Sequence, residues 1–441
     1  MRRFLLIGNG GREHALAKAL AGSRVCSALY AYMSSPNPGI IGLSKGYKIG
    51  EFEELKSLLE FARESKTDIA VVGPEAALAA GVVDALERLG IKCFGPTKEG
   101  ARLETSKGFT RQIMQKYGIP GLPKFKVFSK ITGISQFMDE VKDFVVKPDG
   151  LTGGKGVKVL GEHLHSKDDA LKYCEEVLGS HTAVIIEERL EGEEFSLMSI
   201  TDGKTLAHCP AVQDHKRAYD GDSGPNTGGM GSYSDADHSL PFLREEDIKQ
   251  AWEINSQMLQ ALNNELTSRY KGVMYGGFIA TSQGVKLIEY NARFGDPEAE
   301  NIFPILETDF GEIVKATVEG RLNRMDVRLK NKATVCKYIV PKGYPENPQK
   351  GREISIEEGI EAELYYASII EENGRLIAQS SRSIAVVGIG DTINDAEAAC
   401  QRGVEKIHGS VFYRRDIGTD ALIQKRIAHM KRLRVAEKVI S

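Results

Sequence analysis

Three polar side chains recur at alternate positions in LIEYNARFGDPE, residues 287–298. Successive side chains of a β-strand point to opposite faces, so Glu289, Asn291 and Arg293 are predicted to share one face. A carboxylate and an amide side by side suit Mg²⁺, which takes one or two protein oxygens together with substrate phosphates. A guanidinium on the same face can bind an anion in a bidentate manner. The alternative is a plain salt bridge between Glu289 and Arg293.

A glycine-rich segment, KPDGLTGGKGVKV at residues 147–159, favours the ligand-binding interpretation. It is not a P-loop, because Gly156 stands after Lys155 where a Ser or Thr is required. The segment joins FVVKP to VKVL, two strand-like runs, so it is predicted to be the tip of a hairpin. Backbone N–H groups of such a hairpin can fold over phosphate oxygens, with lysine adding charge. A surface turn is the alternative, but Lys147 on the preceding strand favours phosphate binding.

A third unusual stretch is HKRAYDGDSGPNTGGMGSY, residues 215–233. It is too polar and too rich in glycine for a packed element, so we expect a long loop. Asp214, His215, Lys216 and Arg217 gather just after a strand-like run. Long loops inside compact domains are usually functional.

Near the N-terminus, GNGGRE at residues 8–13 follows a strand and opens a helix, as dinucleotide fingerprints do. Glu13 occupies the place of the third glycine, and the second strand, ALYAYM, does not end in an acidic residue. A nicotinamide-dependent oxidoreductase is therefore disfavoured. A helix N-terminus beside a glycine turn still favours an anion, so a phosphorylated substrate fits.

The elements that position these residues form several units. Residues 3–101 alternate between strand-like and helix-like runs, which predicts a doubly wound parallel sheet. Ligands bind at the carboxyl ends of such strands, which here read GNGGRE, SSPNPG, GPEA and GPT. A smaller unit spans about 121–188, a mixed segment spans 190–325, a β-rich piece starts near 330, and a helix is expected over 419–440.

Composition restricts the class of protein. The 441 residues are 41% hydrophobic and 27% charged with a net charge of −3, so no polyanion-binding surface is indicated and anionic ligands need local donors. The six cysteines lie far apart, which predicts reduced thiols rather than a zinc site or disulfides. No run has the length of a membrane span. We expect a cytoplasmic protein with no nucleic acid or membrane partner.

Taken together, the motifs resemble the phosphoribosylamine–glycine ligase family of ATP-grasp enzymes. The resemblance covers nearly the whole chain and is carried by IGNGGREHA at 7–15, VGPEAALAAGVVD at 72–84, FGPT at 94–97, SKGFTR at 106–111, KPDGLTGGKGV at 147–157, IEERLEGEEFS at 186–196, QDHKRAYDGDSGPNTGGMG at 213–231 and NARFGDPE at 291–298. KPDG with GGKG is common to ATP-grasp enzymes, whereas the last two motifs are specific to this family.

The resemblance implies a multidomain α/β and α+β fold. It has a Rossmann-like substrate domain at 1–103, an ATP-grasp core domain at 104–120 and 189–328, a lid domain at 121–188 and a β-rich C-terminal domain at 329–441. It also implies residue roles. The ATP-binding residues would be Lys107, Lys147, Gly153, Gly154, Lys155, Gly156, the backbone edge of Glu187, Glu188, Arg189 and Leu190, and Glu194 near the ribose. The ligands of Mg²⁺ or Mn²⁺ would be Glu289 and Asn291. The substrate-binding residues would be Gly10, Asn37, Gly39, Glu75, Asp214, His215, Lys216, Arg293, Asp296 and Pro297, with Arg293, Asp214 and Lys216 also catalytic.

The implied reaction joins glycine to 5-phosphoribosylamine with ATP, through glycyl phosphate, in a protein expected to be a monomer. Another purine-pathway ATP-grasp enzyme, a carboxylase or a formate-dependent transformylase, is the alternative within the fold. A non-catalytic ATP-grasp relative is a further alternative, and the retained lysines argue against it.

Three segments depart from the family pattern. SPNPG at 35–39 replaces a PGN-A-G segment, IVPKGYP at 339–345 replaces Ala-Ser-x-Gly-Tyr-Pro, and YYASII at 365–370 replaces Phe-His-Ala-Gly-Thr. Pro38 makes the assignment of the sugar-phosphate residues less direct.

Overall fold

The computed structural model describes residues 1–151 and 156–440. Its first unit is a parallel sheet in the order β3-β2-β1-β4-β5, which confirms the predicted doubly wound arrangement. The strands are β1 (Arg2–Ile7), β2 (Cys26–Met33), β3 (Gly46–Ile49), β4 (Ile69–Val72) and β5 (Lys92–Phe94). The helices are α1 (Gly11–Ala21), α2 (Pro38–Leu43), α3 (Leu55–Glu64), α4 (Glu75–Ala80) and α5 (Val82–Glu87). The apolar runs of β1 and β4 are buried on both faces, as parallel strands require.

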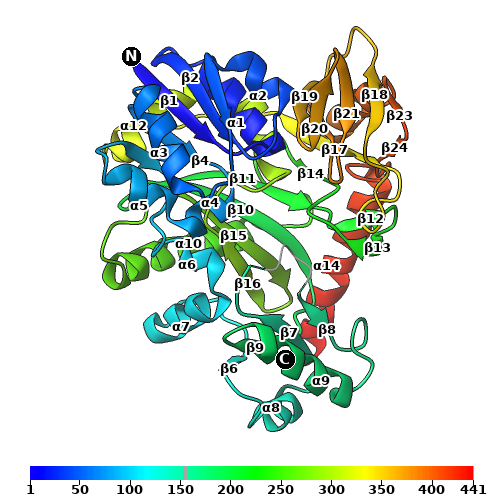
Figure 1. The fold of residues 1–441 in the computed structure, drawn as a ribbon. Coiled ribbons are helices and arrows are strands. Elements are labelled where there is room, and N and C mark those ends of the chain that lie inside the picture. Colours follow the sequence, from blue (N-terminus) through cyan, green and yellow to red (C-terminus); the bar gives the residue numbers. More distant parts are fainter. Residues whose placement is uncertain (152–155, 441) are drawn as a thin grey trace.

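A small antiparallel sheet in the order β6-β9-β7-β8 lies at the opposite end of the molecule (Figure 1). Its elements are β6 (Phe125–Phe128), α8 (Ile134–Val141), β7 (Phe144–Pro148), β8 (Lys158–Val159), α9 (Lys167–Ser180) and β9 (Val184–Glu188). Val146 pairs with Lys158, so the predicted hairpin between FVVKP and VKVL is confirmed. Both helices pack on one apolar face of this sheet.

A central antiparallel sheet lies between the first sheet and the small sheet (Figure 1). The elements from residue 102 to residue 324 outside the small sheet are α6 (Arg102–Thr105), α7 (Lys107–Tyr117), β10 (Glu193–Thr201), β11 (Leu206–Asp214), β12 (Arg217–Tyr219), β13 (Ser223–Asn226), β14 (Gly231–Ser234), α10 (Glu245–Glu265), β15 (Gly272–Thr281), β16 (Gly284–Asn291), α11 (Glu298–Ile302), η1 (Phe303–Ile305), α12 (Phe310–Val318) and η2 (Leu322–Arg324). Strand β16 forms one edge of this sheet and pairs with β15.

The central sheet continues into the C-terminal part through the pairing of β14 with β17. The C-terminal elements are β17 (Ala333–Pro341), β18 (Arg352–Ile356), β19 (Glu363–Tyr366), β20 (Ile369–Glu372), β21 (Arg375–Ala378), β22 (Ile384–Gly390), α13 (Ile393–Val404), β23 (Ile407–Gly409), β24 (Val411–Phe412) and α14 (Asp420–Ile440). Strands β20-β21-β18-β23 form a separate sheet. Helix α14 runs from this region alongside β10 and β15 toward β7 and β8 (Figure 1).

Two expectations about local structure are wrong. Residues 215–233 are not one loop, because they contain the β12–β13 hairpin and strand β14. Long-range contacts support this hairpin, including a hydrogen bond from Arg414 to the carbonyl of Arg217, and such contacts leave no local pattern. SSPNPG is not wholly a loop either, because Pro38 opens α2 after an Asn37 cap.

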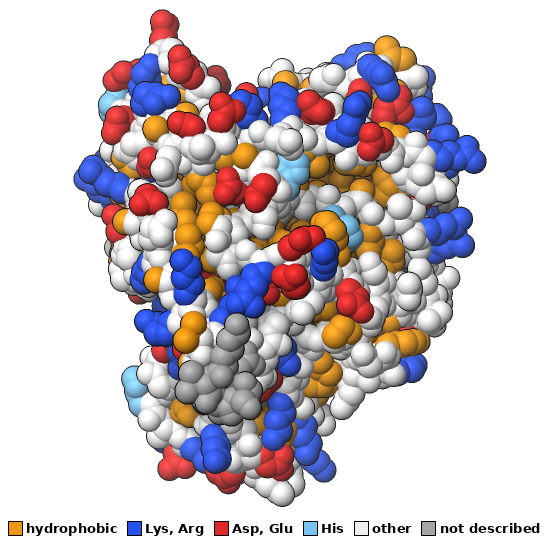
Figure 2. Space-filling view, turned by 180° about the vertical axis from the view of Figure 1, so that it is seen from behind, with side chains coloured by type: hydrophobic (Ala, Val, Ile, Leu, Met, Phe, Trp, Pro, Cys, Tyr) orange, Lys and Arg blue, Asp and Glu red, His pale blue; other side chains and the backbone are white. Residues whose placement is uncertain are grey.

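Other expectations are confirmed. All six cysteines are free, and each except the half-buried Cys26 is buried. None of the helices in the described ranges is long and apolar enough to span a membrane. Figure 2 shows acidic and basic side chains intermixed over one face, in keeping with the balanced composition.

Candidate active site

Strand β16 presents the polar residues as the alternation predicted. Tyr290 and Ala292 face the interior and are 3% and 1% exposed, whereas Glu289, Asn291 and Arg293 are only partly buried. The strand ends at Asn291, and Arg293 follows it closely enough for its Nη2 to lie 3.4 Å from Asn291 Oδ1. The three side chains therefore occupy one side of the sheet edge.

Cations from three other elements surround Glu289. Burial alone would raise its pKa, but Lys216, Lys107 and Lys147 act together to hold the pKa below its usual value. These lysines come from the segment after β11, from the start of α7 and from β7. A carboxylate kept ionised among three ammonium groups is a site that can hold a polyphosphate and its metal ion.

Arg293 does not form the alternative salt bridge with Glu289 among the contacts of the described residues. Its Nε lies 3.3 Å from Glu75 and its Nη2 lies 3.1 Å from the buried Glu104. Burial opposes the charge of Arg293, yet Glu104 and Glu75 raise its pKa overall. Arg293 thus connects the end of β16 to the first unit of the chain.

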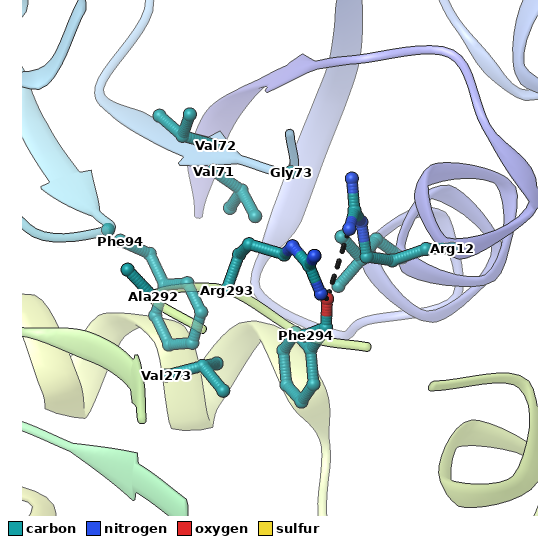
Figure 3. A pocket seen from close by; sticks show the side chains of 11 residues that line it. Arg12, Val71, Val72, Gly73, Phe94, Val273, Ala292, Arg293 and Phe294 are labelled. Carbon is teal, nitrogen blue, oxygen red and sulfur yellow. Dashed lines mark hydrogen bonds between the residues drawn. The ribbon is translucent and has the colours of Figure 1, made fainter. Parts of the chain in front are cut away.

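A second arginine lies beside Arg293. Arg12 Nη1 and Arg293 Nη1 donate to the same carbonyl oxygen, that of Phe294, over 3.0 and 3.1 Å. Figure 3 shows both guanidinium groups meeting at this oxygen, in a small pocket between β4, α1 and the residues after β16. The repulsion between them is offset by Glu13, which lies 2.5 Å from Arg12 Nε, and by Glu75.

The base of the glycine hairpin is tied to the start of α7. Lys107 Nζ donates to the carbonyl of Gly150 over 3.0 Å, and the carboxylate of Asp149 accepts from Ser106 Oγ and Gly108 N. Gly156, at the far side of the hairpin, accepts from Tyr173. Gly153, Gly154 and Lys155 lie outside the described residues, so their predicted contact with phosphate stays a prediction.

Lys147 is held by a buried acid. Its Nζ lies 2.6 Å from Glu187 Oε2, and Arg111 binds the same carboxylate with Nε at 2.6 Å and Nη2 at 3.0 Å. Burial favours the neutral acid, but Arg111 and Lys147 lower the pKa of Glu187 to about 2. The side chain of Glu187 is therefore committed to two cations.

The predicted adenine-binding edge, residues 187–190, spans the last two residues of β9 and the two residues after it. The amide of Glu188 donates to Lys124 O and that of Arg189 to Asp143 O, whereas within the described residues Leu190 N has no backbone partner. Arg189 makes an exposed ion pair with Glu162. Glu194 is more than half exposed and lies 3.8 Å from Lys216.

The Asp214–Lys216 segment splits between two faces. Lys216 lies on the side of Glu289, since each shifts the pKa of the other, and Asp214 lies close enough to Lys216 for the same mutual effect. His215 lies on the opposite side, packed at 5.8 Å from the ring of Tyr233 and 2% exposed. Burial, with Arg414 and Arg426 nearby, lowers the pKa of His215 to about 3. The structure does not bring His215 together with the other predicted substrate residues.

The residues predicted on the sugar-phosphate side are used largely by the protein itself. The amide of Gly10 donates to Glu13 Oε2 over 2.6 Å, which places a carboxylate where a dinucleotide would need the helix N-terminus. Asn37 is 1% exposed and caps α2 through Gly39 N and Ile40 N. A Cβ atom on Gly39 would lie 2.1 Å from the ring of His14, so only glycine fits there.

Asp296 and Pro297 lie where three parts of the chain meet. Asp296 Oδ1 accepts from Tyr338 Oη at 2.7 Å and lies 3.1 Å from Arg382 Nη1. Its Oδ2 lies 3.5 Å from the amide of Arg12 at the start of α1. Pro297 is buried and precedes α11.

Sequence reasoning missed several residues around the site. Tyr338 and Arg382 come from isolated positions of the C-terminal part, without a motif. Arg111 stands in SKGFTR, a segment singled out for Lys107, but its buried partner lies 76 residues away. Glu298, in NARFGDPE, is 2% exposed and accepts from Tyr275 over 2.7 Å.

The donor set fits a hard divalent ion that shares its ligands with a nucleotide. No group of three His, Cys, Asp or Glu side chains within the described ranges could hold a metal alone. Glu289 and Asn291 offer one ionised carboxylate and one amide oxygen. Mg²⁺ commonly binds through one or two such protein oxygens and takes the rest from phosphates and water.

The chain matches three family descriptions in sequence. Phosphoribosylglycinamide synthetase N domain covers residues 2–104, the ATP-grasp (A) domain of the same synthetase covers 105–299, and its C domain covers 334–420. Among solved structures, phosphoribosylamine–glycine ligase from Thermotoga maritima superimposes with a TM-score of 0.79 at 30% identity, covering 94% of this chain and 99% of that one. A biotin carboxylase domain from Hydrogenobacter thermophilus, at 14% identity and a TM-score of 0.73, shares the fold.

Curated relatives agree over almost the full length. A phosphoribosylamine–glycine ligase from Methanosarcina barkeri is 50% identical over 98% of this chain and 100% of its own length. The ligase of the same name from Methanocaldococcus jannaschii is 48% identical over 98% of this chain and 100% of its own length. With the site geometry above, these matches show that the chain belongs to the phosphoribosylamine–glycine ligases, ATP-dependent ligases of purine biosynthesis.

Proposed function

We propose that the chemistry of this ligase takes place at the edge of β16, where Lys107, Lys147 and Lys216 converge on Glu289. The observation that carries the proposal is that all three lysines lower the pKa of Glu289, while Lys147 Nζ lies 3.4 Å from the carbonyl oxygen of Ile288, the residue before Glu289. The carboxylate oxygen of glycine attacks the γ-phosphorus of ATP, and ADP leaves. The amine nitrogen of phosphoribosylamine then attacks the carbonyl carbon of glycyl phosphate, forming the amide as inorganic phosphate leaves.

The protein contributes positions and charges rather than a covalent nucleophile. Lys107 and Lys147 bind phosphate oxygens, while Lys216 and Arg293 offset the negative charge that spreads over the transferred group. Asp214, two residues before Lys216, would accept a hydrogen bond from a substrate ammonium or amine. The glycine hairpin, of which Gly153, Gly154 and Lys155 lie outside the described residues, would, with Gly156, cover the nucleotide and exclude water from the acyl phosphate.

Glu289 and Asn291 would hold Mg²⁺ or Mn²⁺, which would neutralise phosphate charge when bound. The adenine would meet the backbone edge that ends at Leu190, with Glu194 near the ribose. The phosphoribosylamine side would lie toward Gly10, Glu75 and Asp296. His215 is placed away from these groups, so we assign it to packing rather than to substrate contact.

The domain ranges inferred from the sequence fit this arrangement. Residues 121–188 contain the small sheet with Lys147 and would act as the lid, and 104–120 with 189–328 contain β16 and would act as the ATP-grasp core. Residues 1–103 and 329–441 flank the amine side. We also infer that the protein is cytoplasmic and monomeric. Sedimentation velocity at micromolar concentration tests the monomeric state directly.

The experiment is to measure ADP release with ATP, Mg²⁺ and glycine, with and without phosphoribosylamine formed in place from ribose 5-phosphate and ammonia. Turnover should require both glycine and the amine. Glu289→Ala should abolish it, whereas Glu307→Ala, a change at an exposed acid, should not. Turnover that persists in Glu289→Ala would refute the assignment of β16 as the metal strand. Activity with another carboxylate but not with glycine would refute the substrate.

A further inference from the structure

Arg111 is a buried arginine that has no role in the reaction proposed above. It lies in α7, one turn after Lys107, and is 1% exposed. A charge buried so deeply destabilises the fold unless its hydrogen bonds are satisfied, so Arg111 needs partners for its N–H groups. Those partners are informative, because they belong to two different sheets.

The first partner is Glu187 of the small sheet. The guanidinium forms a two-pronged contact with this carboxylate, Nε to Oε1 at 2.6 Å and Nη2 to Oε2 at 3.0 Å. Two parallel charge-assisted bonds fix the orientation of both groups. Glu187 lies on β9, which is paired on one side with β6 and on the other with β7, the strand of Lys147.

The second partner is the strand of the proposed metal ligands. Arg111 Nη2 also donates to the main-chain carbonyl of Ile288 over 2.7 Å, and Ile288 immediately precedes Glu289. Lys147 Nζ lies 3.4 Å from the same carbonyl oxygen. One guanidinium therefore links the small sheet directly to β16.

Glu187 is shared between Arg111 and Lys147. Its Oε2 accepts from both Arg111 Nη2 and Lys147 Nζ, the latter at 2.6 Å. Because Arg111 neutralises this carboxylate, Glu187 orients Lys147 without acting as its sole counterion. Without Arg111, the full charge of Glu187 would fall on Lys147 and would compete with a phosphate for it.

We propose that Arg111 is a positioning residue for the nucleotide: through Glu187 it keeps Lys147 available to phosphate, and through Ile288 it sets the small sheet against the strand of Glu289 and Asn291. Arg111 touches neither reactant. This proposal rests on the proposed assignment of Lys147 to ATP. Its effect is expected on nucleotide binding and not on the binding of glycine.

The test compares Arg111→Met with Arg111→Lys and with Arg102→Lys, a change at the exposed arginine that begins α6. The KM for MgATP should rise about tenfold or more in Arg111→Met, since charge-assisted hydrogen bonds are lost, with the KM for glycine within about twofold. Arg111→Lys keeps the charge but cannot form the two-pronged contact with Glu187. Its KM for MgATP should therefore lie between those of the unaltered protein and Arg111→Met. Arg102→Lys should match the unaltered protein.

The double variant Arg111→Met/Glu187→Gln separates positioning from plain stability. Removing the unbalanced carboxylate should restore the affinity for a non-hydrolysable ATP analogue, measured by calorimetry, at least severalfold relative to Arg111→Met. A double variant that binds the analogue no better, or KM values for MgATP and glycine that rise equally, would overturn the proposal. If Arg111→Met does not fold, the same comparison of the KM for MgATP with the KM for glycine is made in Arg111→Lys. Normal nucleotide affinity in Lys147→Met would instead refute the underlying ATP assignment.

Discussion

The side-chain amide of Asn37 donates a 2.7 Å hydrogen bond to the main-chain carbonyl of Tyr366. The two residues belong to SPNPG and YYASII, two of the segments that the sequence pattern marks as unusual for the family. The main-chain amide of Tyr366 donates to a different residue of the first unit, His14 in α1, over 2.7 Å to Nδ1. The two departures therefore form one contact between the first sheet and the C-terminal part, and a change in either segment has to be accommodated by the other.

Asn37→Ala should destabilise the protein more than the loss of an ordinary helix cap. The change removes the cap of α2 and the bonds to Tyr366 and to Asn9 O, at a buried position. We expect a loss of about 2–4 kcal/mol, since a cap contributes about 1 kcal/mol and unmade buried bonds cost about 1–3 kcal/mol. Thermal unfolding followed by calorimetry measures this.

Ser166→Ala is the matched control, because Ser166 caps α9 through Asp169 at an exposed position without an interdomain bond. It should cost about 1 kcal/mol. Equal shifts of the unfolding temperature in the two variants would show that the contact with Tyr366 contributes nothing.

Local pattern predicted the elements whose periodicity is unbroken, and the residues of the site that lie within them. The alternation in LIEYNARFGDPE placed Glu289 and Asn291 on one face of a strand, as β16 shows. The β12–β13 hairpin was missed because its support comes from Arg414, almost two hundred residues later. His215 was grouped with Asp214 and Lys216 because they are adjacent in the sequence, although its ring is buried against Tyr233. Tyr338 and Arg382 reach Asp296 only through tertiary packing.

Stability should fall as the pH drops below about 6.5, earlier than carboxylate protonation alone would cause. Burial lowers the pKa of His14 and His215 to about 3 and that of His208 to about 4. These imidazoles become protonated near pH 6.5 in the unfolded chain but stay neutral in the folded protein. Their contribution to the free energy of unfolding is therefore fully present above pH 6.5 and is lost as the pH falls toward 4–3. Between pH 7.5 and 5.5, each of these histidines should lower the free energy of unfolding by about 1.4 kcal/mol. Unfolding temperatures across this range measure the effect.

His14→Gln should reduce this pH dependence by about one histidine's share, whereas His165→Gln, at an exposed position, should leave it unchanged. A flat unfolding temperature between pH 7.5 and 5.5 would contradict the assignment of neutral, buried imidazoles.

Lys216→Met should lower turnover with little change in stability. Lys216 is substantially exposed, so its loss should disturb packing little. Of the charged groups that shift the pKa of Glu289, Lys216 has the largest effect, so its charge should act on the reacting groups. We expect kcat to fall about 10²-fold, in the range seen when one electrostatic contact to a transition state is removed. Lys204→Met, an exposed lysine in the turn between β10 and β11, is the control and should be unaffected. A kcat within about threefold of the unaltered protein would remove Lys216 from the proposed mechanism.

Tyr290→Phe should weaken metal use although Tyr290 faces away from the metal strand's polar side. Its hydroxyl donates to Asn255 Oδ1 over 2.8 Å, and Asn255 Nδ2 donates to Ser199, so a buried chain of hydrogen bonds anchors β16 to α10 and β10. Losing the hydroxyl leaves a buried acceptor unpaired, at about 1–3 kcal/mol, between the positions of Glu289 and Asn291. Tyr32→Phe also removes the hydrogen bond of a buried tyrosine hydroxyl, to Glu51 O, but in the first sheet and away from β16. Both variants should unfold at lower temperature, yet only Tyr290→Phe should need more Mg²⁺ for half-maximal ADP release. Equal Mg²⁺ requirements would show that the chain from Ser199 to Tyr290 stabilises the fold without setting the position of the metal ligands.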